Sequence, residues 1–193
     1  MKFRLTYAGP LWGASKNKTR AEHKHAIRMA FHPQLNRLWQ QSAVLRTRNQ
    51  ERVPLEERLA EKYELGGIGF IPLVTSGLSL HCSLDILLLR PGRRGAIIQG
   101  GDIDNRLKTL FDGLRRPLSD DELAGSSIKT VGPKIYCLLE DDSLIDNVSI
   151  ETGDLLEPVD GSEIKENDVR LVITVNVFPH RTGMGNIDFI GVS

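Results

Sequence analysis

The sequence predicts an α/β protein of the α+β type, in which helices pack on a mixed β-sheet. Three observations support this class. Segments with period-2 alternation occur near both ends of the chain, segments with helical periodicity lie between them, and strands and helices do not alternate strictly. The 193 residues fit one domain, and 40% hydrophobic with 26% charged residues is typical of globular proteins. We therefore expect a single domain over residues 1–193.

The N-terminal third combines one strand with a basic helical region at about residues 17–64. Residues 2–8 alternate apolar and polar side chains and predict a strand. Thr19 and Glu22 have the spacing of a capping box, and Pro33 is expected to end the helix that they begin. Further helices are expected over residues 35–45 and from Pro54 to the stop at Gly66 and Gly67. These three helices are additional to the sheet.

The rest of the chain supplies the other strands and one strongly amphipathic helix. An apolar stripe from Ile103 to Leu114 predicts a helix over residues 103–116. Residues 169–178 alternate cleanly and predict a strand. Two apolar strands are expected over residues 68–74 and 78–90, joined around Ser76 and Gly77, and another strand over residues 147–155. Loops are expected over residues 125–127 and 157–167.

The charges are unevenly distributed, although 25 basic and 25 acidic residues give a net charge of zero. Residues 1–50 hold ten basic residues against one acidic residue, a net +9. Residues 140–168 hold eleven acidic residues against one lysine, a net −10. Such a chain either presents a cationic face to a polyanion and carboxylates elsewhere, or has ordinary solvated charged faces.

The composition also bears on compartment and redox chemistry. No stretch approaches about 18 uninterrupted apolar residues and the N-terminus lacks a signal-peptide core, so we expect a cytoplasmic protein without a membrane partner. Cys82 and Cys137 are too few for a disulfide framework and are expected to be buried thiols. The five histidines show no spacing typical of structural zinc, and His23 and His25 are expected on the surface.

The most informative segment is GGDIDNRLKTLFDGL at residues 100–114. At about 100° per residue from Asp104, Arg115 lies at about 20°, Lys108 at about 40° and Asp112 at about 80°, so these charges are expected to share one exposed edge of the helix. Asp102 precedes this helix, where it either caps the N-terminus or holds a metal together with Asp104.

A second acidic cluster, LLEDDSLID at residues 138–146, stands just before an expected strand. Taken alone, this cluster is explained as loop carboxylates that are solvated by water. Together with Asp102 and Asp104 it offers three or four carboxylates beside Lys108, a set suited to Mg²⁺ and to attack on a phosphate by metal-activated water. The basic loop with Arg90, Arg93 and Arg94 is either a contact for backbone phosphates or a solvated loop.

The two acidic segments, DIDNRLKTLFDGL at 102–114 and LEDDSLID at 139–146, resemble the RusA family of Holliday-junction-resolving endonucleases. They are similar to the family's DxDNxxK helix with its FDAL-like continuation and to its later double Asp followed by two apolar residues and Asp. The order of basic loop, acidic helix, double Asp and strand is also similar. The combination is more specific than either segment alone.

This resemblance implies a RusA-like mixed sheet packed by helices, a homodimer, and symmetric cutting of four-way DNA junctions with Mg²⁺ or Mn²⁺. Carried over residue by residue, it implies that Asp102, Asp104 and Asp142 bind the metal, with Asp141 as an adjacent candidate and Lys108 as the catalytic lysine. Basic side chains would bind the DNA backbone without reading bases. The candidates for these DNA contacts are Lys16, Lys18, Arg90, Arg93, Arg94 and Arg115.

The sequence departs from the family pattern at three places, which leaves two other functions open. A longer connection at residues 117–136, the extra helices near residues 34–63, and the segment GAIIQGG before Asp102 are all unusual for the family. One alternative is therefore a catalytically idle, RusA-like DNA-binding or assembly protein. The other is a metal-dependent nuclease for a different branched or single-stranded nucleic acid.

Overall fold

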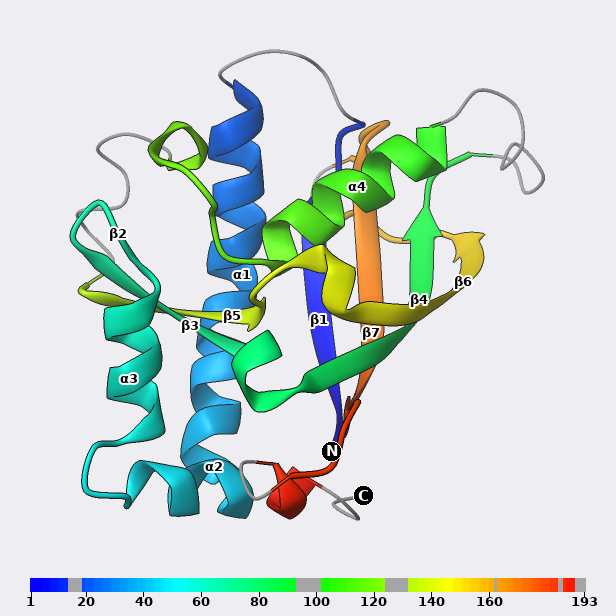
Figure 1. Ribbon diagram of the computed structural model, residues 1–193. Helices are drawn as coiled ribbons and strands as arrows, with labels where there is room; N and C mark the ends of the chain where they lie inside the picture. The colour runs from blue at the N-terminus through cyan, green and yellow to red at the C-terminus, as the bar shows by residue number, and fades with distance from the viewer. Residues whose placement is uncertain (14–18, 93–101, 124–131, 162, 184–185, 190–193) are drawn as a thin grey trace.

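Two mixed β-sheets and four α-helices make up the described part of the chain, which confirms the α+β class (Figure 1). The computed structural model describes residues 1–13, 19–92, 102–123, 132–161, 163–183 and 186–189. Buried apolar side chains from both sheets and from all four helices belong to the core. Among the helices described, none is long and apolar enough to cross a membrane.

The larger sheet has four strands in the order β1, β7, β4, β6. Their bounds are Lys2–Pro10, Asp168–Pro179, Leu80–Arg90 and Ile145–Asp154. β7 pairs antiparallel with β1 and β4, whereas β4 pairs parallel with β6. The alternation of β1 and β7 buries every second side chain, for example Leu5 and Ile173, which face each other in register. The strands predicted from period-2 alternation are therefore confirmed.

The smaller sheet has three strands, β2 (Glu64–Leu65), β3 (Ile68–Val74) and β5 (Lys134–Leu139). All residues of β3 are buried, which fits its uninterrupted apolar sequence. The sequence does not predict β5, because its first three residues fall in the longer connection at residues 117–136. β3 and β4 follow each other in the chain but belong to different sheets, since the turn at η1 (Ser76–Leu78) redirects the backbone between them.

The helices are α1 (Thr19–Gln41), α2 (Ala43–Asn49), α3 (Leu55–Lys62) and α4 (Asp102–Leu114). In Figure 1, α4 runs across the larger sheet and its C-terminal end meets α1. α1 also contacts β1 and β5, so this helix connects the two sheets. The helix predicted over residues 103–116 is confirmed, as is the third helix of the basic region.

The prediction that Pro33 ends the first helix is wrong, because α1 continues through it to Gln41. A proline inside a helix costs roughly 3 kcal/mol. Beyond Pro33, the same face of α1 buries Leu35 and Trp39, at 0% and 1% exposure. Burial of two such side chains contributes roughly 3–6 kcal/mol, which is enough to offset the proline. Gln34 adds hydrogen bonds from its amide nitrogen to the carbonyls of Thr6 and Ala30.

Candidate functional site

Helix α4 carries the centre of the predicted site and is firmly anchored in the fold. Its apolar stripe is buried, with Leu110 and Leu114 at 0% and 1% exposure. Arg106 is also buried and donates hydrogen bonds to the Leu11 carbonyl at 2.7 Å and to Oδ1 of Asn167 at 3.1 Å. These two bonds tie the N-terminal half of α4 to the ends of β1 and of the loop before β7.

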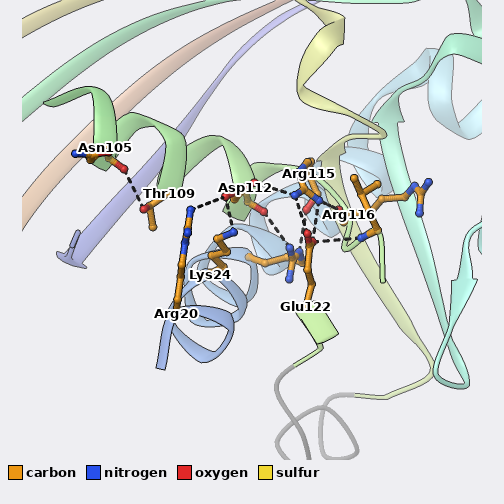
Figure 2. A network of polar contacts seen from close by, with 10 residues as sticks. Arg20, Lys24, Asn105, Thr109, Asp112, Arg115, Arg116 and Glu122 are labelled. Carbon is orange, nitrogen blue, oxygen red and sulfur yellow. Dashed lines mark hydrogen bonds and ion pairs between the residues drawn. The ribbon is translucent and has the colours of Figure 1, made fainter. Parts of the chain in front are cut away.

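The C-terminal half of α4 is held to α1 by ion pairs of Asp112 with Arg20 and Lys24 of α1 (Figure 2). Lys24 Nζ lies 2.5 Å from Asp112 Oδ2, and Arg115 lies 2.8 Å from Asp112 Oδ1. The guanidinium of Arg28 donates to the backbone carbonyls of Asp112 and Arg115, both at 2.9 Å. Arg115 also binds Glu122 through two hydrogen bonds of 2.8 and 2.9 Å. We call the side chains of Lys24, Arg28, Asp112, Arg115 and Glu122 the Asp112 network.

Burial and ion pairing act in opposite directions on the carboxylate of Glu122. Burial alone would raise its pKa, but the hydrogen bonds and charge of Arg115 outweigh this effect and hold the pKa below its ordinary value. Glu122 is therefore ionised when it binds Arg115. A buried network of this kind is strongly destabilised when one partner is removed, because the others keep uncompensated charges.

This network contradicts part of the predicted exposed edge. Asp112 and Arg115 are 6% and 7% exposed, so they belong to the α1–α4 interface rather than to a surface that meets DNA. The predicted DNA contact of Arg115 is therefore not supported. The angular positions place these side chains on one side of α4, but they do not show that α1 covers that side.

Several basic residues of the N-terminal region are buried or paired within the fold, although the sequence analysis expects a basic surface there. Arg28 is 1% exposed, Lys24 pairs with Asp112, and Arg48 forms ion pairs with Glu51 and Asp188. For these residues the interpretation as a cationic DNA-binding face is wrong. Lys24 and Arg48 pair with acidic side chains of the same chain, and Arg28 donates hydrogen bonds to backbone carbonyls.

Two charged side chains of α4, Asp104 and Lys108, remain exposed to solvent. Residues four apart in a helix lie one above the other on the same face, so this carboxylate and ammonium are neighbours on α4. Within the described residues, neither forms a hydrogen bond or an ion pair. Asp102 is the first residue of α4, and only its backbone is described.

The second acidic cluster follows β5, at η4 (Asp142–Leu144). Asp141 is the N-cap of η4, where its Oδ1 accepts a hydrogen bond of 3.0 Å from the Ser143 backbone. The hydrogen bonds from Ser143, with a smaller contribution from Arg115 and Arg116, lower the pKa of Asp141. Asp142 is exposed.

A hydrogen bond of 3.0 Å from the Arg116 backbone to the Leu139 carbonyl ties the end of β5 to the end of α4. The chain therefore enters the Asp141–Asp142 segment beside the last turn of α4. At about 1.5 Å per residue, Asp104 lies about 15 Å back along the helix axis from Leu114, the last residue of α4. In the described structure, no hydrogen bond or ion pair joins Asp104 or Lys108 to Asp141 or Asp142.

The remaining predicted DNA contacts are Arg90, Arg93 and Arg94, at and after the end of β4 in the chain, and Lys16 and Lys18, which precede α1. Arg90 is the last residue of β4 and is half-buried, with its carbonyl accepting a 2.9 Å hydrogen bond from the Leu155 backbone. Arg93 and Arg94 lie outside the described residues, as do Lys16 and Lys18. The basic loop after β4 stays a prediction.

A cavity of about 360 Å³ lies close to the anchored start of α4. It is lined by Trp12, Asp160, Lys165 and Asp168 among others, and the Trp12 side chain is 41% exposed. Lys165 pairs with Asp160 at 2.6 Å, which leaves the lining with an excess of negative charge. Such a cavity disfavours a phosphate, so we do not assign it to the path of the DNA backbone.

The histidines differ from expectation at two places. His23 and His25, expected on the surface, are buried at 6% and 5% exposure. His81 and His180 lie together with Asp146, and their ligand atoms are all within 4.8 Å of one another. Among the described residues, no other three His, Cys, Asp or Glu side chains bring their ligand atoms so close together. The sequence carried no signal for it, because its members come from three strand ends far apart in the chain.

Comparisons with known proteins add no family assignment. No protein-family model matches this chain, and no curated protein matches it. The resemblance to RusA-type enzymes therefore rests on residues 102–114 and 139–146 alone.

Proposed function

We propose that this protein is a RusA-like, metal-dependent endonuclease of the cytoplasm that resolves four-way DNA junctions as a homodimer during DNA recombination and repair. The observation that carries the proposal is the division of charges on α4. Arg106, Asp112 and Arg115 are buried and bonded within the fold. Asp104 and Lys108 have no such bonds within the described residues and face solvent from a helix that cannot easily move.

The donor set fits a hard divalent cation. Carboxylate oxygens and water are the ligands that Mg²⁺ prefers, and the exposure of Asp104 and Asp142 leaves room for water molecules. Asp102, Asp104 and Asp142 would hold Mg²⁺ or Mn²⁺, which requires the segment after β5 to bring the Asp142 carboxylate back along α4 to that of Asp104. Asp141, whose Oδ1 caps η4, would be the adjacent candidate ligand. The bound cation supplies Lewis-acid chemistry at the scissile phosphate.

The residues of the chain have separate tasks in this reaction. The three carboxylates bind and orient the cation against the phosphate. Lys108, one turn beyond Asp104 on the same face, directs its ammonium group towards the negative charge that grows on the phosphate. Arg90, Arg93 and Arg94 would hold the neighbouring backbone, so junction affinity is expected to fall steeply with salt.

The dimer follows from the symmetry of the substrate. A four-way junction has two equivalent strands related by a two-fold axis. Two active sites related by the same kind of axis cut both strands most simply, and a two-fold dimer is the commonest closed assembly.

The test is a cleavage assay on labelled four-way junctions, linear duplexes and single strands, with Mg²⁺ or with EDTA. Paired symmetric nicks confined to the junction, and dependent on Mg²⁺, support the proposal. Junction binding without cuts at any metal concentration would instead indicate the idle DNA-binding or assembly protein. Cuts in the other substrates would indicate a nuclease of different specificity.

Site variants assign the roles. Asp104→Asn and Lys108→Gln are each expected to lower the cleavage rate about 100-fold or more. Asp104→Asn should leave junction binding intact or improve it, since it removes a negative charge from the DNA-facing surface. Asp121→Asn is the matched control, because Asp121 is an exposed carboxylate on η2 (Asp120–Glu122). Loss of junction binding together with cleavage in Asp104→Asn contradicts the assigned role.

A further inference from the structure

Two histidines and one aspartate meet where three neighbouring strands of the larger sheet begin or end. His81 is at the start of β4, Asp146 at the start of β6, and His180 directly after β7. His81 Nδ1 lies 2.6 Å from Asp146 Oδ1, and the two imidazole rings stack with centroids 4.4 Å apart and planes 17° apart. The three side chains come from chain positions that only the sheet brings together.

An irregularity in the sheet occurs at Asp146 itself. Cys82 pairs with Ile145 and Ser83 pairs with Asn147, so β6 has one extra residue at this point and that residue is Asp146. Bulges re-aim the side chain of the extra residue and are rare between parallel strands. Here the bulge accompanies a carboxylate that reaches His81 instead of following the regular alternation.

The backbone at His180 is also held in place. Its N–H donates a hydrogen bond of 2.8 Å to the carbonyl of Ser79. Asn186, which is 3% exposed, donates 2.8 Å hydrogen bonds to the carbonyls of Leu78 and Arg181. The segment after β7 is thus fastened to the turn before β4 at His180 itself and again at Asn186. The Ser79 backbone has φ 49°, a left-handed conformation that is uncommon for residues other than glycine.

We propose that His81, Asp146 and His180 form a binding site for a divalent transition metal of the zinc class. Imidazole nitrogens and a carboxylate oxygen are the donors that zinc takes in proteins, at about 2.0–2.2 Å. Around a tetrahedral ion such atoms lie about 3.3 Å apart, between the 2.6 Å and 4.8 Å of this cluster. Binding one ion requires His81 Nδ1 and Asp146 Oδ1 to move apart from 2.6 Å and the stacked imidazole rings to rotate until a nitrogen of each faces the ion. Mg²⁺ is disfavoured, since it prefers oxygen ligands throughout.

The bound ion would cross-link three strand ends and leave at least one coordination position open. His81 and Asp146 side chains are 20% and 41% exposed, so an ion on them is reached from solvent. Three protein ligands with an open position are typical of zinc sites that bind water or a further ligand, whereas closed structural sites have four. This site differs in ligands and in metal preference from the carboxylate site proposed on α4.

The test is calorimetric titration of the full chain with Zn²⁺ in excess Mg²⁺, which occupies carboxylate sites. We expect one Zn²⁺ per chain. His81→Gln, His180→Gln and Asp146→Asn should each weaken binding at least about tenfold. Asp85→Asn is the matched control, because Asp85 is an exposed carboxylate on the same strand as His81. Wild-type affinity in all three ligand variants, or no binding by the wild-type chain, overturns the proposal.

A second measurement uses the wild-type protein alone, in case a variant fails to fold. Histidine modification by diethyl pyrocarbonate is followed by mass spectrometry with and without Zn²⁺. The proposal requires that Zn²⁺ protect His81 and His180 together. Unchanged modification of both residues in saturating Zn²⁺ refutes it. The junction-cleavage assay is independent of both measurements, so failure of one proposal leaves the other standing.

Discussion

We expect the free energy of unfolding to fall as the pH is lowered from about 7 to 5, with His25 causing about 2 kcal/mol of this fall. His25 lies on α1, is 5% exposed, and neither of its ring nitrogens has a hydrogen-bond partner in the described structure. Burial, with a smaller contribution from the charge of Arg28, lowers the pKa of His25 from 6.5 to about 4.

The sign and the magnitude follow from the two states of the chain. Between about pH 4 and pH 6.5 the unfolded chain binds a proton at residue 25 that the folded chain does not bind. Stability from this residue is therefore complete above the unfolded pKa and is lost as the pH falls below it. With 1.36 kcal/mol per pKa unit, the loss is about 2 kcal/mol at pH 5 and about 3 kcal/mol at pH 4, relative to pH 7.

Urea unfolding at these pH values, followed by circular dichroism, measures the effect. His25→Leu and His25→Phe are compared with the wild-type chain. Each variant is referred to its own free energy at pH 7, so that changes in packing cancel. The difference between pH 7 and pH 5 should shrink by about 2 kcal/mol in both variants. Equal pH dependence in all three proteins refutes the account, because the other titrating groups are common to them.

Two further predictions concern the interface of α1 and α4. Asp112→Ala should lower the free energy of unfolding by about 3–5 kcal/mol in urea denaturation, since it leaves buried cations unpaired, whereas the exposed control Asp120→Ala should change it by less than about 0.5 kcal/mol. Gly113→Ala should destabilise by about 1–2 kcal/mol, because the new Cβ would lie 2.5 Å from Cγ2 and 2.9 Å from Cβ of Ile27. Overpacking here exceeds the gain of up to about 1 kcal/mol in helix propensity, and a rise in thermal unfolding midpoint would contradict this contact.

Much of the secondary structure was predictable because it depends on local periodicity. Alternation alone identified β1 and β7, and the apolar stripe from Ile103 to Leu114 identified α4. The predictions failed where distant packing outweighed a local rule. Pro33 did not end α1 because the residues beyond it are buried, and β5 was missed because its partner β3 lies over sixty residues away.

The same distinction applies to the candidate sites. Helical spacing correctly placed Asp104 and Lys108 on one exposed face of α4. It could not show that Asp112 and Arg115 are covered by α1, because a helical wheel gives directions without neighbours. The predicted convergence of Asp142 with Asp102 and Asp104 stays a prediction, for which the cleavage assay is the test.

The amino-acid sequence by itself determined the fold class, the amphipathic helix and its exposed carboxylate and ammonium, since these follow from repeats of two to four residues. The tertiary structure alone decided which charges are buried in the Asp112 network and that His81, Asp146 and His180 meet. The physical reason is that desolvation, ion pairing and metal ligation depend on distances in space. Such distances between remote residues are set by packing of the whole chain.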